Sequence, residues 1–227
     1  MVSLARFRKL ALALDPAARR LRTEIKRVAG GLAPADSVLD LGSGAAPYAG
    51  LIRHRRYVTA DLLAAADVRC DATILPFRSA AFDLVLCTEL LEHVPDPDAT
   101  LREIRRVMHD RGILLLTTPL TWGVHAPHDY HRWTDSGLIG LLTRHGFQVR
   151  HLRSRGGVFL ALGELLLVIP WQVLGEARER TWWRTLLYAA GYALLVIPAL
   201  GLAALDPLDR RQHFTLGYVV VCGPGGD

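Results

Sequence analysis

Cysteine is scarce in this chain, and the three residues that occur stand far apart. Cys70, Cys87 and Cys222 form no Cys-x-x-Cys pair and no cluster with histidine. A disulfide framework and a zinc site both need such clustering, so we expect neither, and a reducing cytoplasm suits the chain. Charged residues make up only 22%, whereas hydrophobic residues reach 51%. These proportions exclude a disordered chain, a collagen and a coiled-coil rod.

We expect no secretory signal peptide either. The apolar run near the N-terminus is too short for one, and arginines follow it where a small-residue cleavage site would stand. Residues 1–33 instead carry most of the net charge of +5. Asp15 followed by Pro16 predicts a helix start, and the glycine pair 30–31 predicts its end. We expect a basic N-terminal helical segment over residues 1–33, whose cationic face is either solvated or in contact with a membrane or nucleic acid.

From residue 37 onward, short apolar runs alternate with helical patterns. Strands are expected near residues 38–41, 57–60, 68–70, 82–87, 112–117, 147–154 and 213–222. Helices are expected near residues 45–53, from an N-cap at Asp98, and over residues 135–145. Elements that alternate in this way form a mainly parallel α/β sheet with helices on both faces. Ligands bind such sheets beyond the carboxyl ends of the strands, where this sequence places Gly42, Asp61, Asp71 and Thr88.

The motifs at these strand ends carry a family resemblance. The run VLDLGSG at residues 38–44 is similar to the first motif of class I S-adenosylmethionine-dependent methyltransferases. Asp61 matches the acidic residue after their second strand, and DATILPF at residues 71–77 resembles the stretch after their third. FDLV at residues 82–85 with LEHV at residues 91–94 is similar to their fourth-strand motif. The motifs occur in the family's order, which makes the joint signal much more specific than the glycine motif alone.

The resemblance implies a Rossmann-like, mainly parallel seven-stranded sheet with an antiparallel last strand, and S-adenosylmethionine as the cofactor. The methyltransferase domain would comprise residues 34–155 and 206–227, with an apolar helical insertion over residues 156–205. The cofactor-binding residues that the matched motifs imply are Asp40, Gly42, Ser43, Gly44, Asp61, Leu62, Asp71, Ala72 and Thr88.

The chemistry of these residues suits that cofactor. Gly42 and Gly44 let the backbone turn tightly, and a helix beginning beyond them would offer free N–H groups to the methionyl carboxylate. The Asp61 carboxylate can accept both ribose hydroxyls. Asp71 together with the Ala72 backbone would bind adenine.

Three alternatives stay open. A dinucleotide-dependent oxidoreductase shares the glycine turn and the second-strand carboxylate, but Pro47 stands where the third glycine of G-x-G-x-x-G belongs. A nucleic-acid methyltransferase would need a Pro-Pro-aromatic element after the fourth strand, where this chain reads CTEL at residues 87–90. A non-catalytic membrane-bound module would retain the nucleotide pocket for sensing or assembly.

A polar and aromatic loop is expected over residues 119–134. It resembles the loop H-x-x-P-x-D-Y-x-R-aromatic-T of a methyltransferase subgroup linked with polysaccharide and other secondary metabolism. Methyl transfer to a hydroxyl needs a base, and neutral histidine suits that task. Arg132 can pair with Asp129 or hold an anionic group of the acceptor. A metal site is disfavoured because aromatic residues and Arg132 stand between the histidines. The catalytic candidates are His93, His125, His128, Asp129 and Arg132.

Charge is nearly absent from the expected insertion. Residues 157–174 carry one charge, Glu164, and residues 185–205 carry none. The second stretch is long enough to cross a bilayer as a helix. Three interpretations stay open: a hairpin that spans the membrane twice, a pair of helices embedded in one leaflet, and a soluble helical lid or dimer interface. A spanning hairpin would translocate a loop that bears three arginines, against the positive-inside rule.

Together these features predict an enzyme of the cytoplasm attached to the inner face of the membrane. Its acceptor would be a small molecule, a lipid or a lipid-linked glycan, methylated most simply at oxygen. No nucleic-acid partner is expected.

Overall fold

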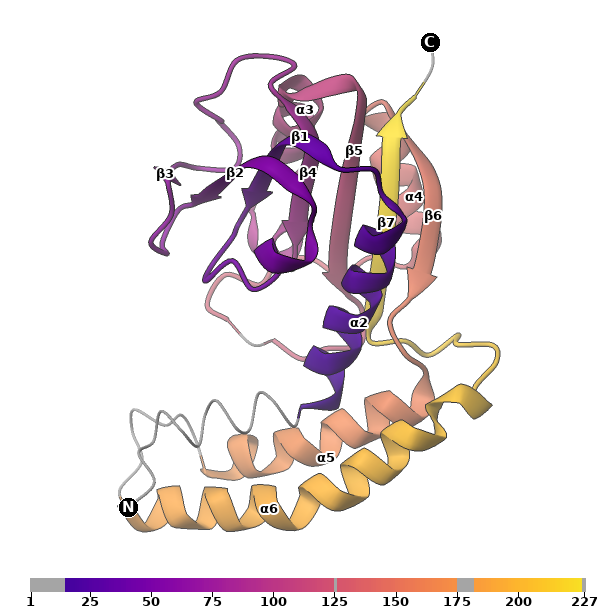
Figure 1. Cartoon of the computed structure of the whole chain (residues 1–227). Helices are drawn as coiled ribbons and strands as arrows, with labels where there is room; N and C mark the ends of the chain where they lie inside the picture. The colour runs from indigo at the N-terminus through magenta and orange to yellow at the C-terminus, as the bar shows by residue number, and fades with distance from the viewer. Residues whose placement is uncertain (1–14, 125, 175–181, 226–227) are drawn as a thin grey trace. The chain divides into compact units, whose positions relative to one another are not determined.

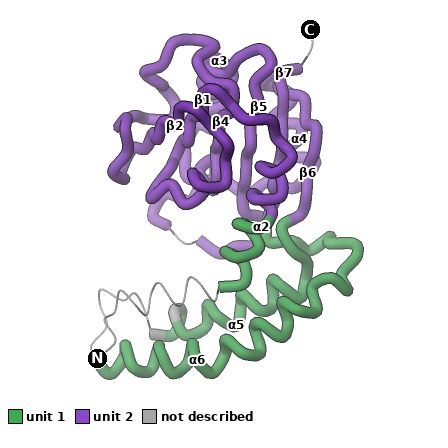
Figure 2. Tube along the Cα trace, in the orientation of Figure 1, with its two compact units in different colours: residues 1–23, 155–216 green, residues 24–154, 217–227 purple. Residues whose placement is uncertain are grey.

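The computed structural model describes residues 15–124, 126–174 and 182–225. The chain divides into two compact units, which Figure 2 distinguishes by colour. The larger unit comprises residues 24–154 and 217–227, and the smaller unit comprises residues 1–23 and 155–216. The smaller unit therefore contains the predicted insertion together with residues from both of its flanks.

The larger unit is built on a seven-stranded sheet with the order β3-β2-β1-β4-β5-β7-β6. Strands β1 to β5 pair in parallel, and β7 runs antiparallel to both β5 and β6. This arrangement confirms the predicted Rossmann-like sheet with an antiparallel last strand. The strands are β1 (Ala35–Leu41), β2 (His54–Asp61), β3 (Val68–Arg69), β4 (Phe82–Thr88), β5 (Met108–Pro119), β6 (Phe147–Ser154) and β7 (Gly217–Pro224).

Helices cover both faces of the sheet (Figure 1). Helices α3 (Pro97–Val107) and α4 (Asp135–Arg144) pack in one apolar core, in which Leu114 and Leu116 of β5 are fully buried. The second half of α2 (Pro16–Gly31) lies on the opposite side (Figure 1). Because successive side chains of a strand point to opposite faces, the uninterrupted apolar run of β5 is buried on both sides.

The prediction of a helix over residues 45–53 is wrong. The chain makes only a 3-10 turn, η1 (Ala49–Leu51), after a left-handed Ala46 with φ of 49°. Pro47 is the physical reason, because its ring disfavours the right-handed helical conformation at the residue before it. The glycine turn is consequently not followed by a helix N-terminus.

Two smaller boundaries also differ from the prediction. The N-cap of α3 is Asp96 rather than Asp98, because Pro97 takes the first helical position and the capping residue stands directly before it. The Asp96 carboxylate accepts a hydrogen bond from Ala99 N at 2.8 Å, whereas Asp98 bonds His145 Nε2 at 2.6 Å. The last strand begins at Gly217 instead of residue 213.

The smaller unit contains two antiparallel helices, α5 (Val158–Leu174) and α6 (Trp182–Leu205), followed by the 3-10 turn η3 (Asp206–Leu208). Glycine lets the helices approach closely, since a Cβ on Gly163 would stand 2.8 Å from the carbonyl oxygen of Ala199. The buried Asp206 carboxylate accepts hydrogen bonds from Gly157 N and Leu160 N, at 2.8 and 3.0 Å. It thereby satisfies N–H groups at the start of α5 that have no partner within the helix.

Glu164 is a buried acid in the middle of α5, with 2% of its surface exposed. Its Oε1 accepts a hydrogen bond from Ala17 N in the first turn of α2, at 2.8 Å. Burial, and then the charge of Asp15, raises the pKa of Glu164 to about 8, although Arg155 acts in the opposite direction. Burial, and then the neighbouring Asp15, Tyr188 and Glu164, raise the pKa of Tyr192 in α6 to about 12.

This raised pKa makes the stability of the chain depend on pH. The folded state favours protonated Glu164, so its contribution is complete below the ordinary value of 4.5 and is lost as pH rises through about 8. We expect Glu164→Gln to remove that loss, so that its melting temperature exceeds that of the parent chain by more at pH 8.5 than at pH 5. Thermal unfolding followed by circular dichroism measures the difference. Equal slopes for both proteins would contradict the assignment.

Candidate cofactor and active site

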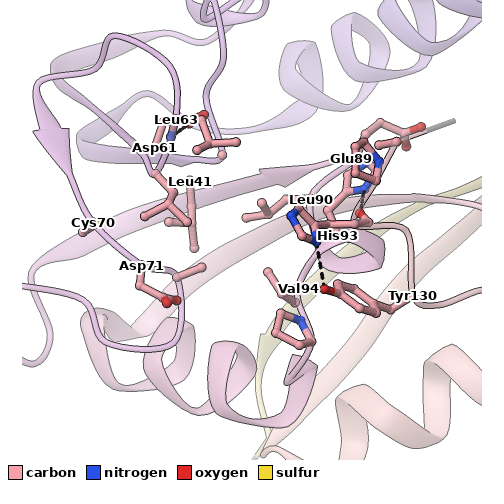
Figure 3. Close-up of a pocket in the computed structure, with 17 residues that line it drawn as sticks. Leu41, Asp61, Leu63, Cys70, Asp71, Glu89, Leu90, His93, Val94 and Tyr130 are labelled. Carbon is pink, nitrogen blue, oxygen red and sulfur yellow. Dashed lines mark hydrogen bonds between the residues drawn. The ribbon is translucent and has the colours of Figure 1, made fainter.

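A cavity of about 550 Å³ lies beyond the carboxyl ends of β1, β2, β3 and β4. Figure 3 shows Asp61 and Asp71 on one side of it, with Leu90, His93 and Tyr130 on the other. The parallel register of these strands brings their ends to one edge of the sheet. Predicted site residues that line the cavity are Gly42, Asp61, Leu62, Asp71, Ala72, His93 and His128.

The glycine turn after β1 requires glycine at residue 42. Gly42 has a φ of +69°, and a Cβ there would stand 2.8 Å from Cδ1 of Leu90, across the cavity wall. Its N–H donates to the carbonyl oxygen of Ala60 at 2.8 Å, which ties the turn to β2. The N–H groups of Gly44 and Ala46 already have partners, in the Asp61 carboxylate and the Ser43 carbonyl. The expected helix N-terminus for the methionyl carboxylate is therefore absent, and that prediction is wrong.

Asp61 is held as an oriented anion at the end of β2. Its Oδ1 accepts hydrogen bonds from Leu63 N and Ala64 N at 2.8 Å, and its Oδ2 accepts one from Gly44 N at 3.0 Å. Partial burial alone would raise the pKa of Asp61, but these N–H donors together lower it. An ionised carboxylate has about four lone-pair positions, so one position on Oδ2 is open for a ribose hydroxyl. To accept hydrogen bonds from both ribose hydroxyls, Asp61 would have to lose one of the two backbone hydrogen bonds to its Oδ1.

Asp71 follows β3 and is oriented in the same manner. Thr73 donates to Asp71 Oδ1 twice, from its backbone N and from its Oγ1, both at 2.8 Å. These bonds lower the pKa of Asp71 and fix the carboxylate beside Ala72 at the cavity wall. Both bonds go to Oδ1, so Oδ2 is the oxygen placed to accept from a ligand.

Four predicted cofactor residues do not line the cavity: Asp40, Ser43, Gly44 and Thr88. Asp40 is buried within β1, where burial raises its pKa and the Tyr57 hydroxyl donates to it at 2.7 Å. Ser43 and Gly44 shape the turn itself. Their direct contact with a cofactor stays a prediction.

The residue after Thr88 lines the cavity and was missed by sequence reasoning. Glu89 has a left-handed backbone, with φ of 49°, and accepts a hydrogen bond from Thr117 Oγ1 at 2.9 Å. A non-glycine residue in this conformation costs energy and is concentrated at functional sites. Its position directly after the fourth strand could have predicted that Glu89 lines the cavity.

His93 is oriented by a hydrogen bond to the loop that follows β5. It belongs to the 3-10 turn η2 (Leu91–His93), and its Nδ1 donates to the carbonyl oxygen of His128 at 2.6 Å. Since a carbonyl oxygen can only accept, the neutral ring carries its proton on Nδ1 and its lone pair on Nε2. The buried Glu92 carboxylate lies 3.7 Å from Nε2.

An ion pair between Arg132 and Asp129 stabilises the loop that follows β5. Arg132 bonds both oxygens of Asp129, with 2.7 Å between Nη2 and Oδ2, and also donates to the carbonyl oxygen of Trp122 at 3.2 Å. The Asp129 carboxylate holds the pKa of Arg132 above its usual range. Of the two predicted roles for Arg132, the structure places it in the pair with Asp129, away from the cavity lining. Its catalytic role and that of Asp129 stay predictions.

Two other histidines of this loop were predicted as catalytic candidates, and the structure describes one of them. His128 lines the cavity, and its Nδ1 lies 3.0 Å from the hydroxyl of Tyr130, a cavity residue that sequence reasoning did not select. His125 lies outside the described residues.

The fold and the cavity define a class: an α/β domain with a cavity at its strand ends, lined by a glycine turn and two carboxylates, where such sheets bind their ligands. A family model described as a methyltransferase domain matches residues 11–155. This match covers well over half of the chain, so the chain belongs to the methyltransferase-domain family. The sheet order and the matched domain place it in the class I S-adenosylmethionine-dependent methyltransferase family.

Two curated relatives match over part of the chain. The 27-O-demethylrifamycin SV methyltransferase of Amycolatopsis mediterranei is 32% identical over 90 residues, which cover 38% of this chain and 33% of that protein. The ubiquinone/menaquinone biosynthesis C-methyltransferase of Xanthomonas campestris pv. campestris is 35% identical over 102 residues, which cover 35% of this chain and 40% of that protein. The chain thus spans well under half the length of both relatives.

A solved structure shares the fold. The 1,6-didemethyltoxoflavin-N1-methyltransferase of Burkholderia thailandensis, with bound 1,6-didemethyltoxoflavin and S-adenosylhomocysteine, has a TM-score of 0.54 and 18% sequence identity. The similarity covers 94% of this chain and 80% of that one.

The residues present fit S-adenosylmethionine. Gly42 leaves backbone space where any side chain would meet Leu90, and Asp61 and Asp71 each present an oxygen with open acceptor capacity. Asp61 Oδ2 would hold the ribose and Asp71 Oδ2 the adenine amino group, and Leu41 and Val94 would contact the adenine ring and the sugar as apolar walls.

Proposed function

We propose that this enzyme methylates a hydroxyl group of a small molecule, a lipid or a lipid-linked glycan. The observation that carries the proposal is the His93 ring, held by the His128 carbonyl with the lone pair on Nε2, at a cavity wall opposite Asp61. A hydroxyl must lose its proton as it is methylated, and an oriented neutral histidine can accept that proton.

The chemical demands on the chain are modest. When bound, S-adenosylmethionine supplies an activated methyl group on a sulfonium centre. The residues of this chain then need to align the acceptor, exclude water and remove one proton. His93 Nε2 is the atom that accepts the proton.

Oxygen is the acceptor atom that this arrangement suits best. A neutral amine can attack the methyl group with its own lone pair and needs no base beforehand, whereas a hydroxyl gains from one. The 27-O-demethylrifamycin SV methyltransferase, matched at 32% identity, is consistent with oxygen, whereas the ubiquinone/menaquinone relative is a C-methyltransferase. The apolar cavity residues Leu90 and Pro127, on the side of His93 and His128, suit an acceptor with an apolar portion.

A dinucleotide-dependent oxidoreductase is disfavoured by the turn geometry. Such enzymes place the pyrophosphate at the N-terminus of the helix after the glycine turn. Here Ala46 and Pro47 replace that helix with the 3-10 turn η1.

We further propose that the enzyme works on the cytoplasmic face of the membrane, attached through α5 and α6. A lipid or lipid-linked acceptor would then reach the cavity from the membrane in which it resides.

Equilibrium binding tests the cofactor assignment. We expect isothermal titration calorimetry to show micromolar binding of S-adenosylhomocysteine and no heat of binding for NAD⁺ under the same conditions. The reverse pattern would favour the oxidoreductase.

Metabolite and lipid profiling of a deletion strain tests the methylation itself. An unmethylated precursor should accumulate in that strain, and an unchanged profile would favour the non-catalytic module.

A further inference from the structure

Helix α6 is apolar on two opposite faces. On the inner face, Tyr192 and Ala199 are buried together with Leu167 of α5. On the outer face, large apolar side chains recur at helical spacing and remain exposed: Trp183, Leu186, Leu187, Leu194, Ile197 and Leu205. Only 11% of the most apolar window within residues 182–208 is buried, and its mean hydropathy is 2.0. A helix that is apolar all round normally lies in a protein core or in lipid.

Helix α5 repeats this pattern. Its exposed apolar side chains follow one another at intervals of three or four residues: Leu162, Leu165, Ile169 and Val173. The exposed apolar residues of α5 and α6, together with Trp182, form what we call the outer apolar surface. It runs along the full length of both helices, and patches of this kind mark sites of interaction with lipid or protein.

The charge of the smaller unit identifies a lipid surface as the partner. Its residues 1–23 and 155–216 contain twelve lysines and arginines against six acidic residues, whereas the rest of the chain is nearly neutral. Trp182 and Trp183 are exposed at the start of α6, where the Arg184 guanidinium lies 5.3 Å from the ring of Trp183. Basic side chains beside exposed tryptophans and an uncharged apolar surface are typical of helices at anionic membranes.

The contact with α2 argues against insertion across the membrane. Glu164 lies six residues beyond the start of α5, about 9 Å along its axis, and is bonded there to Ala17 N. A spanning hairpin would carry Glu164, the first turn of α2 and the exposed Arg19 into the hydrocarbon, where charged groups are costly. The 17 residues of α5 also reach only about 26 Å, short of a core of about 30 Å.

We propose that α5 and α6 lie flat in one leaflet of an anionic membrane, with the outer apolar surface in the acyl region and the arginines at the headgroups. This inference rests on the membrane attachment proposed for the enzyme and adds its mode. The apolar side chains extend along both helices instead of gathering at the tip, as a flat orientation requires.

Vesicle flotation of the full chain tests the surface. We expect the chain to float with vesicles of phosphatidylcholine and phosphatidylglycerol, and less with phosphatidylcholine alone or at high salt. The double variant Leu194→Glu/Ile197→Glu should lose at least about tenfold in partitioning, since both side chains are 75% exposed and enter the acyl region. The matched control, Ile74→Glu/Val124→Glu, changes residues 76% and 77% exposed in the larger unit and should float as before.

Further measurements separate the outcomes. A monomeric chain that does not float with the vesicles overturns the proposal. A stable dimer that dissociates in the Leu194→Glu/Ile197→Glu variant overturns it too.

Labelling of a cysteine tests the flat orientation. Arg184→Cys in sealed vesicles should react with an impermeant maleimide added outside, above the background of the parent chain. Protection of this cysteine would indicate that the helices span the membrane and would overturn the flat orientation. Affinity for S-adenosylhomocysteine in solution should be the same for both double variants, so failure of docking and failure of the cofactor site are distinguished.

Discussion

Asp61→Ala is expected to weaken the binding of S-adenosylhomocysteine by roughly 30- to 100-fold, because one charge-assisted hydrogen bond to a ribose hydroxyl contributes about 2 to 3 kcal/mol. The carboxylate is already fixed by Leu63 N, Ala64 N and Gly44 N, so little ordering cost is paid on binding. Removing it also releases the turn after β1. Calorimetric titration of parent and variant measures the change.

A matched aspartate separates the ribose contact from general loss of a loop carboxylate. Asp67 accepts hydrogen bonds from Thr59 N and Thr59 Oγ1, at 2.9 and 2.8 Å, and stands outside the cavity lining. Asp67→Ala should therefore leave the affinity close to that of the parent chain. Unchanged affinity in a folded Asp61→Ala protein would remove the ribose role. Asp61→Asn retains one oxygen without the charge and should fall between the two.

His93→Ala is expected to lower kcat by about 100- to 10,000-fold, the range of general base catalysis. Affinity for S-adenosylhomocysteine should change little, since the ring faces the acceptor side of the cavity rather than Asp61 and Asp71 (Figure 3). Rates are measured as transfer of labelled methyl groups into an extract of a deletion strain, in which the unmethylated acceptor accumulates.

The pH profile distinguishes a base from a structural histidine. A base must be unprotonated, so the parent rate should fall on the acid side, and His93→Ala should lose this limb. His54 provides the control, because its Nδ1 also bonds a carbonyl oxygen, that of Ile52 at 2.8 Å, at the far end of β2. His54→Ala should keep both the rate and the acid limb. A His93→Ala protein with the parent profile would contradict the assignment.

Local sequence patterns were sufficient to predict the sheet and the residues on one wall of the cavity. Apolar runs separated by helical segments predicted parallel strands, and parallel strands necessarily bring their carboxyl ends to one edge. Gly42, Asp61 and Asp71 could therefore be assigned to one site without coordinates. The failure at residues 45–53 was also local in origin, because Pro47 acts on the conformation of Ala46, and the alanines around it concealed that effect.

The opposite wall of the cavity depended on contacts between distant residues. The bond from His93 Nδ1 to the His128 carbonyl joins residues 35 positions apart, and Tyr130 N donates to the carbonyl oxygen of Glu92. No periodicity encodes such pairs, since they form only after β4 and β5 have aligned. The same holds for Arg132, whose sequence allowed two partners and whose fold selected Asp129.

The sequence alone determined the class of fold, the methyl donor and the two carboxylates that line the cavity, because all of these follow from short-range spacing along strands. Tertiary structure alone decided which nitrogen of His93 holds the lone pair, that Arg132 closes its own loop, and that Glu164 is buried against a helix 147 residues away. These are consequences of packing, in which a partner is chosen by proximity in space and by the cost of leaving a buried polar group unpaired.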